Sequence, residues 1–168
     1  LFSGYIASSA ETSYVDGLTF RNNISFNNKT SGLHMTTKSN TDESYIQNID
    51  IVDNVFYEQS GAGVEVGNRL SDGMNIQNID IQNNIVFVEN ADKQHMYVND
   101  DAINVSETNN IYWPSPERFY GANLDPTSTV ADPNFVDAAG IDDLIYKYVS
   151  GDDSAAVTAA VSEVQSRL

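Results

Sequence analysis

The chain has 168 residues, which is the length of a single domain. Its 24 acidic and 8 basic residues give a formal net charge of −16, which argues against nucleic acid as a partner and disfavours an anionic membrane surface. It has no cysteine, which excludes disulfides and thiolate metal sites, and it has no run of about 18 apolar residues, so we expect no membrane insertion.

Four asparagines recur at a nearly constant spacing, and each precedes an aliphatic residue. They are Asn23, Asn54, Asn84 and Asn110, and they lie 31, 30 and 26 residues apart. Similar residues surround them, as in GLTFRNNISF, NIDIVDNVFY and NIDIQNNIVF. A period in this range indicates stacked coils, because one coil cannot bury its apolar side without neighbours.

Each repeat contains three short apolar stretches with a period of two. In the first stretch Leu18 and Phe20 fall on one face and Thr19 on the other. The second and third stretches lie at 24–26 and 33–35, and both recur in the next two repeats. Three strands per repeat, joined by bends that contain Asn and Gly, are typical of a parallel β-helix. We expect the stacked asparagines to bond one another along its axis.

These coils and two further motifs resemble a known class of proteins. The motifs are GVEVGN at 63–68 and DPNFVD at 132–137. With the NNIxF-type coils, they resemble the right-handed parallel β-helix proteins of the pectate-lyase-like class over roughly residues 14–137. The resemblance implies an all-β, right-handed parallel β-helix (solenoid). It also implies a carbohydrate-active function, but one scaffold of this kind carries many functions.

In chain order, residues 1–137 are expected to form the β-helix and residues 138–168 a C-terminal α-helical cap. The coils are predicted at 14–40, 45–72, 75–101 and 102–113, followed by a long loop and a last short strand at Phe135 and Val136. In the cap, Ser154 is a suitable N-cap, and an apolar stripe at helical spacing follows it. The stripe consists of Val157, Val161, Val164 and Leu168.

No comparable cap precedes the first coil at Tyr14. Solenoid ends need covering, so we expect the chain to be the C-terminal part of a larger β-helix with further coils upstream. The alternatives are a free-standing small solenoid and one whose N-terminal end is covered by a partner chain. The acidic composition and the lack of cysteine suit a secreted protein of bacterial type, extracellular or periplasmic.

A column of polar side chains on the third strands is the candidate site. Coils stack about 4.8 Å apart, so equivalent outward residues form columns. His34, Glu65 and Tyr97 are equivalent in successive coils, and Lys38, Arg69 and Asp101 follow four residues later in each. A solvated polar face is the alternative interpretation.

Two chemistries fit this column. In β-elimination on a uronate polysaccharide, Lys38 would be the base, Arg69 would neutralise the carboxylate, and Tyr97 or His34 would be the acid. In glycoside hydrolysis, Glu65 would act with Asp101 or with the neighbouring Asp100. No motif in the sequence is specific to either reaction.

A second column contains Thr19, Asp50 and Asp80 on the first strands. Two carboxylates on adjacent coils repel one another unless they are solvated or bridged, and Ca²⁺ binds carboxylate oxygens readily. A bridging Ca²⁺ and solvent-facing aspartates are both interpretations of this pair. Calcium is the one cofactor that we consider.

The sequence therefore favours a polysaccharide-processing protein, part of a β-helix polysaccharide lyase or glycoside hydrolase, with a polysaccharide or oligosaccharide as its partner. The alternatives are a non-catalytic glycan-binding solenoid, such as part of an adhesin or tail fibre, and a purely structural repeat.

Overall fold

The computed structural model describes residues 4–8, 14–26, 28–37, 44–57, 59–67, 75–115 and 118–135, and for 4–8 it describes the backbone alone. The chain divides into two compact units, Leu1–Asp132 and Pro133–Leu168. All the elements below belong to the first unit. In the second unit only 133–135 are described, and they lie in no strand. The predicted cap at 138–168 and Val136 of the predicted last strand lie outside the described residues.

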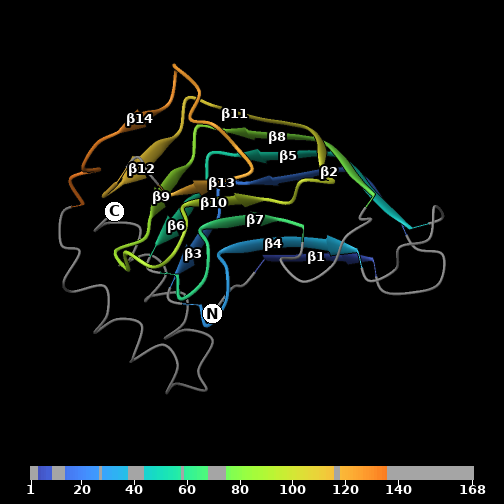
Figure 1. Cartoon of the computed structure of the whole chain (residues 1–168), viewed down its shortest axis with the longest axis horizontal. Coiled ribbons are helices and arrows are strands. Elements are labelled where there is room, and N and C mark those ends of the chain that lie inside the picture. Colours follow the sequence, from blue (N-terminus) through green and yellow to red (C-terminus); the bar gives the residue numbers. More distant parts are fainter. Residues whose placement is uncertain are drawn as a thin grey trace. The chain divides into compact units, whose positions relative to one another are not determined.

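The described residues form fourteen strands and no helix, and all strands pair in parallel within three sheets (Figure 1). The described part of the chain is thus all-β. It also contains no helix long and apolar enough to cross a membrane.

We name each sheet after one of its central strands. The β5 sheet has the order β11-β8-β5-β2, with bounds Ile103–Thr108, Ile76–Gln82, Tyr45–Val52 and Tyr14–Arg21. The β6 sheet has the order β14-β12-β9-β6-β3, with bounds Thr129–Val130, Ile111–Trp113, Ile85–Phe87, Val55–Tyr57 and Ile24–Phe26. The β7 sheet has the order β1-β4-β7-β10-β13, with bounds Gly4–Ser8, Leu33–Thr37, Val64–Val66, Met96–Val98 and Phe119–Tyr120.

From β2 to β13 the chain visits the β5, β6 and β7 sheets in turn, and each sheet therefore takes every third strand. Figure 1 shows β2, β5, β8 and β11 side by side at the top of the view. The three strands predicted per repeat are confirmed, and parallel pairing at this stride is compatible with a β-helix-like fold.

Residues with left-handed backbone decide which side chains of the β5 sheet face the core. Gly17, Asn48, Asn78 and Asn104 all have positive φ and lie within β2, β5, β8 and β11. Such a residue interrupts the alternation of faces. In β5 it lies between Ile46 and Ile49, which are three residues apart and both fully buried. Glycine and asparagine occupy these positions because they tolerate left-handed backbone at low cost.

The core lies between the sheets and consists mainly of aliphatic side chains that repeat at the same register. Ile49 pairs with Ile79, and Val64 pairs with Met96. The fully buried side chains include Leu33, Met35, Ile51, Phe56, Ile76, Ile81, Val86 and Tyr112. Tyr57 and Phe87, which are register partners, stack with ring centroids 4.9 Å apart.

The asparagine ladder is the main buried polar feature of the core. Oδ1 of Asn54 accepts bonds from the backbone N–H (2.9 Å) and Nδ2 (3.1 Å) of Asn23, and Asn84 and Asn110 repeat this pattern toward the C-terminus. The side chains of Asn54, Asn84 and Asn110 are buried. The left-handed residue at each bend is the one before the ladder position: Asn22, Asp53, Asn83 and Asn109. The bend and the ladder are thus made by two adjacent residues.

The structure has two strands where the sequence indicates a long loop. Phe119–Tyr120 forms β13 beside β10, and Thr129–Val130 forms β14 beside β12. Each strand has only two residues, which is too short to show a period in the sequence. Phe135, in the predicted last strand, lies in no strand.

Candidate functional site

The predicted column lies across adjacent strands of the β7 sheet. Register pairs His34 with Glu65 and Glu65 with Tyr97, and the structure extends the column to Tyr120 on β13. Their neighbours in sequence, such as Leu33, Val64 and Met96, belong to the buried core. The column therefore projects from the opposite face of this sheet.

Glu65 and Tyr97 are far less exposed than solvated side chains would be. Each has an exposed fraction of 8%. The Glu65 carboxylate accepts a bond from Ser31 Oγ at 2.5 Å. The Tyr97 ring stacks on Tyr120 with centroids 4.8 Å apart and an angle of 6° between the planes. A fully solvated face does not describe these two positions.

His34 is half-buried and held by the turn that follows β7. Its Nε2 lies 3.1 Å from the carbonyl oxygen of Gly67. Because a carbonyl only accepts, Nε2 carries the proton in this contact. Gly67 has a φ of 95°, and a Cβ there would lie 2.4 Å from Cβ of Asn99. Glycine at this position lets the turn that holds His34 form.

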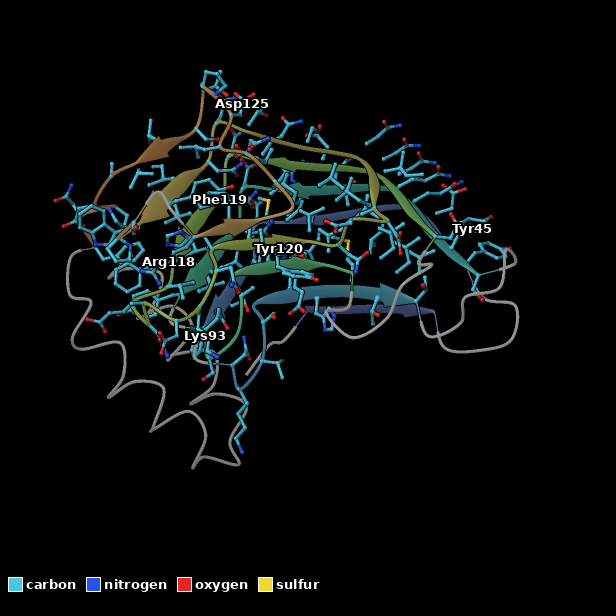
Figure 2. The ribbon with its side chains drawn as sticks, in the orientation of Figure 1. Tyr45, Lys93, Arg118, Phe119, Tyr120 and Asp125 are labelled. Carbon is cyan, nitrogen blue, oxygen red and sulfur yellow. The ribbon has the colours of Figure 1, made fainter. Side chains whose placement is uncertain are left out.

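Tyr120 is the exposed member of the column, with an exposed fraction of 48%. Figure 2 shows it over the strands of the β7 sheet, whereas Asp125 lies at the top of the view, near β11. The sequence prediction missed Tyr120 because it placed this residue in a loop. The short spacing between Tyr97 and its register partner Tyr120, which breaks the period of about 31 residues, hid the equivalence.

The other predicted residues are not brought into a described cluster. Lys38 follows β4 and Arg69 follows β7 in sequence, but both lie outside the described residues. Asp100 and Asp101 follow β10 on an exposed turn, where Asn99 Oδ1 accepts the backbone N–H of Asp101. The roles of these four residues stay predictions.

Asp50 and Asp80 are register partners on the outer face of the β5 sheet, as predicted. Thr19 Oγ1 donates to Asp50 at 3.3 Å and Ser106 Oγ donates to Asp80 at 2.9 Å, and the Gln82 amide donates to the other oxygen of Asp80. These donors occupy some of the lone pairs that a cation would need.

The fit to calcium is therefore poor. Ca²⁺ takes six to eight oxygen ligands, and the described part of the chain holds no group of three or more acidic or histidine side chains placed to bind a metal. Calcium at Asp50 and Asp80 stays a prediction. The same face borders a shallow hollow of about 550 Å³.

A second hollow of about 490 Å³ borders β11 and residues 121–126. It contains Glu107, a buried carboxylate that the sequence analysis overlooked. Glu107 Oε2 accepts bonds from Ser128 Oγ (2.7 Å), Tyr112 OH (3.0 Å) and Asn110 Nδ2 (3.0 Å), and Oε1 accepts the backbone N–H of Asp125. Both oxygens are thus bonded within the protein, so Glu107 anchors residues 125–128 to the end of the ladder.

Two histidines have different roles in the fold. Unlike His34, His95 is fully buried, with Nε2 donating to the Trp113 carbonyl oxygen at 2.6 Å. Burial, helped by the nearby positive charge of Arg118, lowers its pKa to about 4, although the bond to Trp113 opposes this shift. The neighbouring rings of Tyr112 and Phe119 complete its surroundings. His95 is therefore a neutral core residue.

We compared the chain with protein-family models, with curated proteins and with solved structures. None of these three comparisons found a match. The class to which the chain belongs is therefore defined by its architecture alone: an all-β protein with parallel sheets.

Proposed function

We propose that this chain is a segment of a right-handed parallel β-helix of the pectate-lyase-like class and that it processes a polysaccharide. The site would be the outer face of the β7 sheet. The observation that carries the proposal is the register column of His34, Glu65, Tyr97 and Tyr120 on four adjacent strands. It combines acid–base groups with an exposed ring on which a sugar can stack.

The column supports a lyase better than a hydrolase. Glycoside hydrolysis needs two carboxyl groups on either side of the bond, and among the four column residues only Glu65 is a carboxylate. β-Elimination needs a base, a group that neutralises the uronate carboxylate, and an acid for the leaving oxygen. Tyr97 or His34 would be the acid, and the sequence-predicted Lys38 and Arg69 would be the base and the neutralising group. Tyr120 would position the sugar ring.

The direct test offers uronate polysaccharides to the protein and records two products. A lyase forms a carbon–carbon double bond conjugated to the carboxylate, which absorbs ultraviolet light, whereas a hydrolase forms reducing ends without that absorbance. With an active substrate, Tyr97→Phe keeps the stacked ring but removes the hydroxyl, and it is expected to lower kcat by about 10² to 10⁴ with little change in KM. The matched control is Tyr14→Phe, because Tyr14 is exposed and lies on β2, in the β5 sheet rather than in the β7 sheet.

Non-catalytic glycan binding is the second candidate. It is favoured by the low exposure of Glu65 and by its bond to Ser31, which together leave little of the carboxylate accessible. Under this alternative Tyr120→Ala weakens glycan binding about tenfold, the loss of roughly 1.4 kcal/mol, and no substrate gives either product. Absence of both binding and turnover across neutral, uronate and amino-sugar polymers would contradict the carbohydrate proposal as a whole.

A further inference from the structure

β1 is the third strand of a repeat whose first two strands are not found among the described residues. Complete repeats run through the β5, β6 and β7 sheets in that order, as in β2-β3-β4 and β5-β6-β7. β1 pairs with β4 in the β7 sheet, with Gly4 opposite Leu33. It therefore holds the third position of a repeat. Among the described residues no strand holds the first two positions, and the other sheets end at β2 and β3.

The uncovered strand β2 exposes residues that belong to the core. Leu18 is in register with Ile49 and has an exposed fraction of 38%, whereas Ile49 is fully buried. Val15 and Phe20 are half-buried, although their register partners Ile46 and Ile51 are fully buried. By contrast, Leu33 and Met35 on β4, which β1 covers, are fully buried. At this end of the core, the apolar residues of β2 are therefore partly exposed, whereas those of β4 beside β1 are not.

The asparagine ladder also ends without a partner at this point. Each Oδ1 of Asn54, Asn84 and Asn110 accepts two bonds from the asparagine before it. Asn23 Oδ1 accepts none from the described residues, although Asn23 donates forward like the others. At the opposite end, Ser128 and Glu107 accept the last donors of the ladder. The ladder is thus closed at its C-terminal end, whereas at its N-terminal end Asn23 Oδ1 accepts no bond from the described residues.

We propose that the open edges of β2 and β3 are a docking surface for two further parallel strands that lead into β1 and complete its repeat. The occupant has the same repeat chemistry. It places aliphatic residues against Leu18 and Phe20 and an asparagine whose backbone N–H and Nδ2 donate to Asn23 Oδ1. A second copy of the chain at this edge is the competing outcome of the test.

The test supplies such strands from the protein's own sequence. Gly4 and Val64 are both register partners of Leu33, so a copy of residues 44–63 fused directly before Gly4 keeps the register. The copy brings its own Ile49, Ile51 and Asn54. Two control fusions carry the copied segment either with Asn54→Ala or in scrambled order. The measurement is amide hydrogen exchange of β2, followed by mass spectrometry.

We expect the fusion to slow exchange of the β2 amides at least tenfold and to raise Tm relative to the chain without it. The scrambled fusion should change neither, and the Asn54→Ala fusion should give a smaller effect. Unchanged β2 exchange, in a fusion whose β5 and β8 amides remain protected, would overturn the proposal. So would a parent chain that dimerises in sedimentation experiments and loses β2 protection on dilution, because the edge would then bind a second copy. Neither result bears on catalysis at the β7 sheet.

Discussion

At the residue scale, buried amides hold successive repeats together. Asn84 accepts two bonds from Asn54 and donates to Asn110 Oδ1 and to the carbonyl oxygen of Ile51. All four bonds lie in a core where a lost partner is not replaced by water. The recurrence of asparagine therefore reflects hydrogen bonding along the stack more than turn formation.

We expect Asn84→Ala to lower the free energy of unfolding by about 2–4 kcal/mol, because it leaves the buried Asn54 N–H without its acceptor and removes a donor from the Ile51 carbonyl. Urea unfolding followed by circular dichroism measures this change. Gln47→Ala is the control, since Gln47 makes comparable amide bonds on the outer face and should cost under about 1 kcal/mol. Equal losses for the two variants would contradict a special role for the ladder.

The burial of His95 predicts a pH dependence of stability. Its folded-state pKa of about 4 lies below the ordinary value of 6.5, so the unfolded chain binds the proton more readily. The contribution to stability is complete above about pH 6.5 and is lost as pH falls toward 4, by at most about 3 kcal/mol. His95→Gln should remove this part of the loss between pH 7 and pH 5. If the free energy of unfolding fell equally for the two proteins between pH 7 and pH 5, the lowered pKa of His95 would be refuted.

The sequence predicted the equivalence of His34, Glu65 and Tyr97 because each lies between two core residues in a repeated pattern. It did not predict the burial of Glu65 and Tyr97, which depends on Ser31, just before β4, and on Tyr120 of β13. Glu107 could not be found from its own position either. It takes the inward register of Ile81, where an aliphatic residue is expected, and its partners lie on the segments that follow.

At the scale of the element, short strands and bends repeat together. The nine strands of the first three repeats follow the alternation of apolar residues in the sequence. The two-residue strands β13 and β14 do not, because tertiary pairing with β10 and β12 defines them. The left-handed residues inside the β5 sheet could not be predicted from the sequence either, since nothing in the sequence distinguishes a left-handed asparagine within a strand from any other asparagine.

The bend between β8 and β9 gives a test of this geometry. Asn83 has a φ of 54°, which a β-branched side chain adopts only with strain. We expect Asn83→Val to lower the free energy of unfolding by about 1–2 kcal/mol and Asn83→Gly to change it by less than about 1 kcal/mol. Thermal unfolding of the two variants measures the difference. A valine variant as stable as the glycine variant would exclude the left-handed bend.

At the scale of the whole molecule, the charge of −16 opposes the folded state. Among the described residues one ion pair is present, Arg21 with Asp53, and both side chains are exposed. The carboxylates of Asp16 and Asp125 instead rely on hydrogen-bond donors. Gln47, Asn48 and Thr127 lower the pKa of these groups below its usual value. Neutral donors thus take the place of cations.

We therefore expect NaCl to stabilise the protein. Raising ionic strength from about 0.01 M to about 0.15 M shortens the screening length from roughly 30 to 8 Å, and Tm should rise by a few degrees. Differential scanning calorimetry in the presence of a chelator checks this without interference from divalent ions. Arg21→Gln should leave the salt dependence nearly unchanged, because an exposed pair contributes little. A Tm that falls with NaCl would show that attractive charge pairs dominate.

The asparagine ladder has a further consequence, because all its amides point the same way. Aligned amide groups sum to a permanent dipole, as peptide units do in an α-helix. The negative pole lies at Asn23, and the positive pole lies at Asn110, whose Nδ2 donates to the Glu107 carboxylate. The one buried carboxylate at an inward position of the described β5 sheet thus sits where this field stabilises its charge. Each repeat added before Asn23 would lengthen the dipole and leave that carboxylate at its favourable pole.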